Sequence, residues 1–323
     1  MMKSKSLFTM IMIFGTIMTV SSNNWVSMWM GLEINMMAFI PLISNKNKNS
    51  SQAMMIYLLT QSVSSMMLMF AIIMNQMTLS SSWYNIMLIS LLIKLSAAPF
   101  HMWLPEIMTK MTWSSSAVLM TWQKIAPLTM INNLNYNNKI IYIAIILSVI
   151  MGTVGGLNQM SMRKIMSYSS INHMGWMLSL SKMKNNWIIY LMIYSIMIIM
   201  MCWMFEQYNM IHINQVNSMN MTMSEKMNYF ISMLSLGGLP PFLGFMPKWI
   251  TINSLINNNS LIILVIMMMF SLLSLYYYMR MMTSMMMNMA ANNKWMFIKS
   301  SNIIIIMMIT NMSLPVVMNI NLI

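Results

Sequence analysis

Apolar stretches of about 20 residues follow one another along the whole chain, separated by short polar breaks. A helix rises about 1.5 Å per residue, so each stretch is long enough to cross a hydrocarbon layer of about 30 Å. The pattern predicts an all-α polytopic membrane protein with about eleven transmembrane helices. Their expected ranges are 6–22, 24–44, 52–74, 83–104, 112–131, 139–159, 164–182, 186–207, 226–256, 260–283 and 301–321.

Helix-breaking residues interrupt two of these spans. The span 83–104 contains Pro99 and is followed directly by Pro105, and we expect both to interrupt it. The span 226–256 is too long for one straight helix and is rich in glycine and proline. Proline removes a backbone donor and clashes with the preceding turn, so we expect a broken helix in each span.

The two broken spans are the fourth and the ninth, so they hold the same place in two successive groups of five. An odd number of helices per group inverts the second group in the membrane, and broken helices at matching places of inverted repeats mark transport sites. We therefore expect a single membrane domain over residues 1–323. It would consist of a first repeat, a second repeat and a C-terminal helix, at 1–131, 139–283 and 299–323.

The composition agrees with a membrane location. The chain is 59% hydrophobic and only 7% charged, with a mean hydropathy of +0.66, which is outside the range of soluble proteins. The 17 Lys and Arg residues against 4 acidic residues give a net charge of +13. The basic residues stand singly or in pairs between spans, which is typical of topology signals and not of a nucleic-acid-binding surface.

The basic residues divide unequally between the two sides of the predicted helices. The side that includes the N-terminus holds Lys3, Lys5, Lys46, Lys48, Lys110, Arg163, Lys164, Lys226, Arg280, Lys294 and Lys299. The other side holds Lys139, Lys182 and Lys184. By the positive-inside rule, the N-terminus should face the positive-inside compartment and the C-terminus the opposite one.

Residue types suited to redox chemistry are scarce. A single cysteine, Cys202, excludes an internal disulfide and cannot hold an iron–sulfur cluster, which needs about four protein ligands. The three histidines show no metal-ligand spacing, and no glycine-rich dinucleotide fingerprint follows a strand. We expect no cofactor on this chain. Any redox chemistry associated with it must take place on other chains.

Methionine is unusually abundant, with 56 residues spread over spans and loops alike. A Met-rich functional surface would be confined to one region. Codon drift in an AT-rich genome whose code reads ATA as methionine explains an even spread better, and indicates an animal mitochondrial gene.

Four charged residues lie inside apolar spans: Glu33, Lys94, Lys124 and Lys248. A charge at the centre of a membrane helix costs about 2.5–3.5 kcal/mol even on lenient insertion scales, and such residues usually mark ion or proton paths. A lysine can instead extend along its stem to the interface, but glutamate is too short to do so from mid-span. The four residues are therefore candidate stations for protons.

Each of these lysines stands close to a helix break. Lys94 precedes Pro99, and Lys124 precedes Pro127, while Lys248 follows the Gly–Pro-rich segment. An opened helix exposes carbonyl groups that can hold water or an ammonium group. Burial disfavours the ammonium form and a nearby carboxylate favours it, so a lysine balanced between the two can take up and release a proton.

Three further residues are secondary candidates. His101 and Glu106 flank the first break and are expected to form an exit from it. His173 lies in the second repeat at the place that matches Glu33 and could serve as a neutral relay imidazole, or be a satisfied core histidine.

Five segments carry a resemblance to a known family: GLEINMMAFIPLI, KLSAAPFHMWLPE, TWQKIAPL, RKIMSYSSINHMGWM and GGLPPFLGFMPKW, in this order over residues 31–249. They resemble the antiporter-like membrane subunits of mitochondrial NADH–ubiquinone oxidoreductase (respiratory complex I). The third and fourth segments resemble its chain 2 family in particular, and the methionine bias is similar to that of insect mitochondrial genomes. The resemblance implies an antiporter-like fold in the shortened animal form.

The resemblance also implies proton pumping driven by quinone reduction in other subunits. The essential mid-membrane glutamate of the family matches Glu33, and the lysine of its first broken helix matches Lys94. The lysine of the following helix matches Lys124, and that of the second broken helix matches Lys248.

The surroundings that the resemblance implies are the mitochondrial inner membrane, with the N-terminus on the matrix side and the C-terminus on the intermembrane-space side. Partners would be the other complex I membrane subunits (chains 3, 4, 4L and 6), accessory subunits and lipids including cardiolipin, with no nucleic acid. NADH, FMN, iron–sulfur clusters and ubiquinone would be handled by other subunits. Two alternatives stay open: a free-standing cation/proton antiporter subunit, and a structural membrane subunit without its own proton path.

Overall fold

The computed structural model describes residues 2–44, 48–78, 82–134, 138–181, 186–218, 223–286 and 302–314, and these ranges are almost entirely helical. The α-helices are α1 (Met2–Ser21), α2 (Trp25–Ile43), α3 (Lys48–Thr78), α4 (Ser82–Lys94), α5 (Trp103–Lys110), α6 (Trp113–Thr121), α7 (Ile125–Asn133), α8 (Asn138–Leu157), α9 (Met162–Ser179), α10 (Asn186–Gln207), α11 (Ile213–Ser218), α12 (Met223–Gly237), α13 (Phe245–Asn257), α14 (Leu261–Met286) and α15 (Asn302–Asn311). A single 3₁₀ turn, η1 (Trp122–Lys124), joins α6 to α7 within the described ranges.

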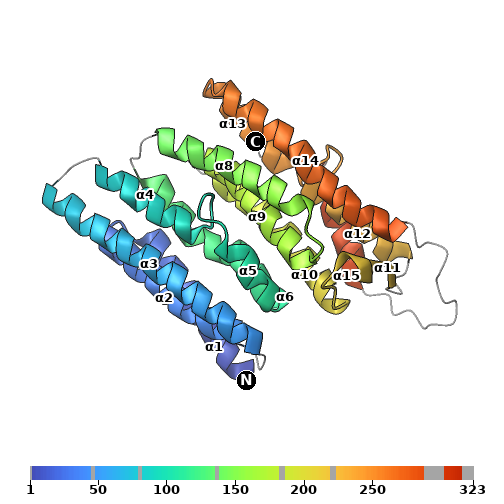
Figure 1. Ribbon diagram of the computed structural model, residues 1–323, viewed down its shortest axis with the longest axis horizontal. Helices are drawn as coiled ribbons and strands as arrows, with labels where there is room; N and C mark the ends of the chain where they lie inside the picture. The colour runs from blue at the N-terminus through green and yellow to red at the C-terminus, as the bar shows by residue number, and fades with distance from the viewer. Residues whose placement is uncertain are drawn as a thin grey trace.

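The helices lie side by side with their axes roughly parallel (Figure 1), from α1–α3 at one side of the molecule to α13 and α14 at the other. Within the described residues, five helices are long and apolar enough to cross a membrane: α2, α3, α8, α10 and α14. Large apolar side chains such as Met66 and Ile262 are exposed on the outside, where hydrocarbon would be their solvent. The protein is thus a helical membrane protein.

Both expected breaks are present. The chain leaves helical geometry between Lys94 and Trp103, and again between Gly237 and Phe245. Pro105, however, was wrongly expected to interrupt the first broken helix, since it is the third residue of α5. The first-turn N–H groups of a helix have no intrahelical partner, so proline is tolerated there.

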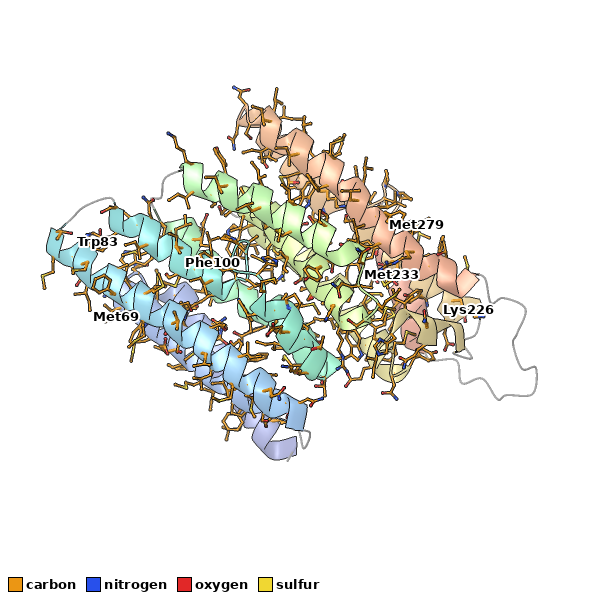
Figure 2. All side chains as sticks on the ribbon, viewed as in Figure 1. Met69, Trp83, Phe100, Lys226, Met233 and Met279 are labelled. Atoms are coloured by element: carbon orange, nitrogen blue, oxygen red, sulfur yellow. The ribbon has the colours of Figure 1, made fainter. Side chains whose placement is uncertain are left out.

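One end of the bundle holds several of the described basic residues that the sequence assigned to one side. Arg163 donates to the Thr109 carbonyl oxygen at 3.0 Å, and Arg280 donates to the Gln159 carbonyl oxygen at 2.6 Å. Figure 2 places Lys226 at this end and Trp83 at the opposite end. Lys46, Lys182, Lys184, Lys294 and Lys299, as well as the end of the expected C-terminal helix, lie outside the described residues.

Helix α8 packs against α9 at backbone distance. A Cβ atom added to Gly152 would lie 2.5 Å from the backbone nitrogen of Asn172, and one added to Gly175 would lie 2.5 Å from Val149 Cγ2. Contacts below 3 Å leave no room for a side chain, so glycine is required at both positions. This close packing fixes the position of α9 against α8.

Two features differ from the sequence-based expectation. The short helix α11 was not predicted, because four of its six residues are polar and the segment is too short to show a period. Tryptophan near a span end is typical of a membrane interface, but Trp113 and Trp187, near the starts of α6 and α10, are buried inside the protein.

Candidate functional site

Glu33 is the ninth residue of the 19-residue helix α2, where it is surrounded mainly by apolar side chains. Its Oε1 atom is buried and has no hydrogen-bond partner in the described part of the chain. The carboxylate is near enough to Lys94 and Tyr57 to interact with them electrostatically. An unpartnered buried oxygen costs about 1–3 kcal/mol, so Glu33 is a strong acceptor for a proton or a water molecule.

Lys94 is the last residue of α4 and directly precedes the first break. Only 7% of its surface is exposed. The indole Nε1 of Trp103 donates to the Ile93 carbonyl oxygen at 3.2 Å, which ties the start of α5 to the end of α4. The ammonium group therefore sits at the negative end of the α4 dipole, which favours a cation.

A small cavity connects Lys94 with Lys124, since both side chains line it. It offers about 20 Å³ to the centre of a water-sized sphere, and about 10–15 Å³ is enough to hold a water molecule. The polar side chains in its wall are Asn35, Tyr57, Gln61, Ser96 and Gln123. The cavity is thus roomy and polar enough for water to bridge the two lysines.

Gln123 organises the wall of this cavity. Its Nε2 atom donates to Asn35 Oδ1 at 3.0 Å, and its Oε1 atom accepts a long contact of 3.5 Å from the Tyr57 hydroxyl. These bonds join α2, α3 and η1, so the residue before Lys124 is held in place by two other helices.

Lys124 lies in the 3₁₀ turn between α6 and α7 and is 3% exposed. Its Nζ atom donates to the Ser170 carbonyl oxygen of α9 at 3.2 Å. It also lies 4.9 Å from the centre of the Tyr194 ring, within cation–π range. The ammonium group is thus solvated by a carbonyl oxygen and an aromatic face.

His173 lies on α9, one turn after Ser170, and is 4% exposed. Its Nδ1 atom hydrogen-bonds to the Tyr190 hydroxyl at 2.8 Å, and its ring lies 4.9 Å from that of Tyr194. Both Lys124 and Lys248 are near enough to act on it electrostatically. His173 therefore lies between the two lysines.

Lys248 belongs to the first turn of α13 and reaches back to the end of α12. Its Nζ atom donates to the Gly237 carbonyl oxygen at 2.6 Å and lies 5.7 Å from the centre of the Trp176 ring. Gly237 is the last residue of α12, so the ammonium group caps the negative end of that helix.

One stripe of α9 joins the two halves of this arrangement. Ser170, His173 and Trp176 are spaced by three residues, which places them along one side of a helix. Ser170 contacts Lys124 and Trp176 contacts Lys248, with His173 between them. Helix α9 is thus the structural link between Lys124 and Lys248.

The secondary candidates at the first break behave differently from each other. His101 is buried, and its Nδ1 atom lies 3.2 Å from the Pro99 carbonyl oxygen. Glu106 is exposed on α5, away from the buried lysines. Tyr190 and Tyr194 were not among the residues predicted from the sequence, although their spacing of four residues places both on one face of α10.

The family model described as NADH:quinone oxidoreductase/Mrp antiporter matches residues 22–82 and 74–274. A curated relative from Anopheles gambiae, NADH-ubiquinone oxidoreductase chain 2, is 46% identical over 264 residues, which covers 78% of this chain and 77% of the relative. The corresponding protein from Oryctolagus cuniculus is 41% identical over 266 residues, covering 77% and 75%.

Solved structures share the fold at low sequence identity. A chain of respiratory complex I from Thermus thermophilus, solved with bound aureothin, superposes with a TM-score of 0.83 at 20% identity and covers 94% of this chain and 75% of that chain. A chain of the Mrp complex from a Dietzia species gives a TM-score of 0.78 at 15% identity, covering 86% and 59%.

Proposed function

The chain belongs to the NADH-ubiquinone oxidoreductase chain 2 family, and from this premise we propose that Glu33, Lys94, Lys124, His173 and Lys248 form a buried proton relay. The chain is a proton-translocating membrane-arm subunit of the H⁺-translocating NADH:ubiquinone oxidoreductase. Quinone reduction takes place on other subunits of the enzyme and drives proton movement through this one. NADH, FMN, iron–sulfur clusters and ubiquinone are therefore assigned to those subunits.

The observation that carries the relay is the stripe on α9. Lys124 and Lys248 are far apart in the sequence. Lys124 contacts the Ser170 carbonyl oxygen of α9 and Lys248 the Trp176 ring, three residues before and three residues after His173. A histidine between two lysines can accept a proton at one ring nitrogen and release one from the other. This arrangement supports proton transfer along the middle of the bundle.

The first half of the relay uses water in place of direct contact. The cavity beside Lys94 and Lys124 has room for about one water molecule and a polar wall, and Glu33 offers an unpartnered carboxylate oxygen near Lys94. A proton would pass between Glu33 and Lys94, then through cavity water to Lys124.

Electrostatic repulsion couples neighbouring stations. At a separation of roughly 10 Å and an effective dielectric constant of about 20, two like charges repel by about 1.7 kcal/mol. That is more than a tenfold bias against charging both stations at once. Loading one station therefore favours release from the next, which moves a proton without a large movement of the chain.

The fuller architecture is part of this proposal: eleven transmembrane segments, in which α4–α5, α6–α7 and α12–α13 each form one crossing. The two broken segments are the fourth and ninth, in agreement with inverted five-helix repeats over 1–131 and 139–283 and a C-terminal helix over 299–323. His101 and Glu106 are proposed as an exit from the first break.

The protein is a mitochondrial membrane protein, and we assign it to the inner membrane. The basic residues gathered at one end of the bundle support an N-terminus on the matrix side and a C-terminus on the intermembrane-space side. Its partners are the other complex I subunits, with chains 3, 4, 4L and 6, accessory subunits and cardiolipin as the specific proposals.

Replacing Lys124 with methionine in the assembled enzyme tests the relay. We expect Lys124→Met to leave assembly intact on a native gel and to slow NADH-driven proton pumping into vesicles at least about tenfold, because a neutral side chain cannot carry the proton. Lys139→Met, which changes an exposed lysine at the start of α8, should pump at the normal rate.

Other outcomes would favour the two alternatives. If Lys94→Met and Lys124→Met reduce the amount of assembled complex but not the activity of the complex that does assemble, the chain is a structural subunit. Normal pumping in both assembled variants would exclude the relay. The likeness to the Mrp chain raises the antiporter alternative. It predicts Na⁺-driven pH changes in vesicles that contain this chain alone.

A further inference from the structure

A groove unrelated to the charged residues of the relay opens on the outside of the bundle between α1, α6 and α10. It offers about 390 Å³ to the centre of a water-sized sphere, far more than the cavity between Lys94 and Lys124. Met12, Val118, Ile199 and Trp203 contribute to its walls. Ile199 is 52% exposed, so the groove is open to the medium that surrounds the helices.

The walls of the groove give water little to bind. Thr121 also lines it, but its hydroxyl already donates to the Ala117 carbonyl oxygen at 2.7 Å. Apart from the end near Glu206, the groove is roomy and apolar, and such a cavity does not hold ordered water. In a membrane its surroundings are acyl chains, and an unfilled groove would forfeit dispersion contacts along its whole wall.

One end of the groove is polar and carries a charge. Glu206, the second-last residue of α10, lines it and is exposed. Its carboxylate makes no hydrogen bond or ion pair with any residue that the structure describes, so it is available to an ammonium group.

The opposite wall at the same end suits an anion. Ser114, in the first turn of α6, lines the groove beside Glu206. The guanidinium group of Arg163 lies 5.5 Å from the centre of the neighbouring Trp113 ring. The Ser114 hydroxyl lies 3.3 Å from Thr112 Oγ1, and the N–H groups at a helix start favour a phosphate group nearby.

We propose that this groove binds a zwitterionic phospholipid with a primary ammonium headgroup, phosphatidylethanolamine. One acyl chain fills the groove, the ammonium group pairs with Glu206, and the phosphate lies near Ser114. The groove runs from Glu206 to Ile199, seven residues or about 10 Å along α10, which matches the upper part of a leaflet about 15 Å deep.

The headgroup must supply the selectivity, because every lipid tail is equally apolar to the groove wall. A lone carboxylate at the mouth attracts an ammonium group and repels a lipid whose headgroup is only anionic. Phosphatidylglycerol and cardiolipin are therefore disfavoured at this position. Phosphatidylcholine, which has no N–H donors for the carboxylate, should rank between them and phosphatidylethanolamine.

Photocrosslinking of the intact enzyme tests the site. The enzyme is placed in nanodiscs containing phosphatidylethanolamine with a photoactivatable diazirine in one acyl chain, or phosphatidylglycerol with the same chain. Adducts are then mapped by peptide mass spectrometry. We expect adducts on α6 and α10, with phosphatidylethanolamine labelling about two- to fivefold more than phosphatidylglycerol, as for an exposed ion pair.

Two variants and one control distinguish recognition of the headgroup from binding of the acyl chain in the groove. Glu206→Gln should make labelling by the two lipids equal. Ala117→Phe, which adds a ring to the groove wall, should reduce labelling by both lipids. Glu106→Gln removes an exposed carboxylate that does not line the groove, and the labelling ratio of the two lipids should stay as in the unmodified enzyme. Equal labelling in the unmodified enzyme, preference for phosphatidylglycerol, or no adducts because a neighbouring subunit covers the groove would each overturn the proposal.

Discussion

Gly238 determines where the Lys248 ammonium group can lie. Its φ of +75° is in the left-handed region that favours glycine. A Cβ atom added there would lie 2.6 Å from Lys248 Nζ and 2.7 Å from Lys248 Cε. Gly237 offers a matched control, because its added Cβ would meet Leu275 at an ordinary 3.7 Å.

The size of the effect follows from two costs. An alanine held in left-handed geometry costs about 1–2 kcal/mol, which lowers stability without stopping assembly of a large complex. Displacing Lys248 also weakens its 2.6 Å bond to the Gly237 carbonyl oxygen. A hydrogen bond to a charged group contributes about 1.5–3 kcal/mol, which is tenfold or more in the occupancy of the protonated lysine.

We therefore expect Gly238→Ala to slow NADH-driven proton pumping about tenfold while Gly237→Ala pumps almost normally. Pumping is followed by quenching of a pH-sensitive dye in vesicles, and assembly by native gel. Combining Gly238→Ala with Lys248→Met isolates the cause. Equal pumping in the two glycine variants would show that Gly238 does not act through the lysine. Pumping in the double variant that is a further tenfold slower than in Lys248→Met alone would show the same.

Two other changes test the surroundings of α9. Tyr190→Phe removes the hydroxyl that bonds His173 Nδ1 at 2.8 Å, worth about 1 kcal/mol. We expect roughly fivefold slower pumping and an altered pH profile of the coupled rate; an unaltered profile would count against a relay role for His173. Gly152→Ala forces a Cβ to within 2.5 Å of the Asn172 backbone nitrogen, and overpacking costs about 1–3 kcal/mol. The assembled enzyme with Gly152→Ala should unfold at a lower temperature in a thermal scan than the enzyme with Gly237→Ala. Identical unfolding midpoints for the two variants would mean that α8 and α9 separate easily.

The sequence allowed the helices and the chemistry within each helix to be predicted. Apolar length predicts the spans, and the charges at Glu33, Lys94, Lys124 and Lys248 are visible because hydrocarbon makes them costly. The breaks are visible because proline and glycine act locally. Pro105 misled the prediction, since the same residue is tolerated in the first turn of α5.

The contacts between helices could not be predicted. Nothing in the sequence near Ser170 indicates that its carbonyl oxygen receives the Lys124 ammonium group, because every residue has such an oxygen and packing alone selects one. The partnership of Tyr190 with His173 likewise depends on how α10 lies against α9. Periodicity places a residue on a face but does not identify the helix opposite.

The glycine contacts between α8 and α9 bear on the reorganisation energy of proton transfer. A helix held at backbone distance through Gly152 and Gly175 cannot rotate about its axis without a steric clash. The dipoles around His173 are then oriented before any proton arrives, so little work is spent on turning them. The moving parts are reduced to lysine side chains and cavity water, which rearrange in nanoseconds or less, so transfer along α9 need not wait for a slow motion of the backbone.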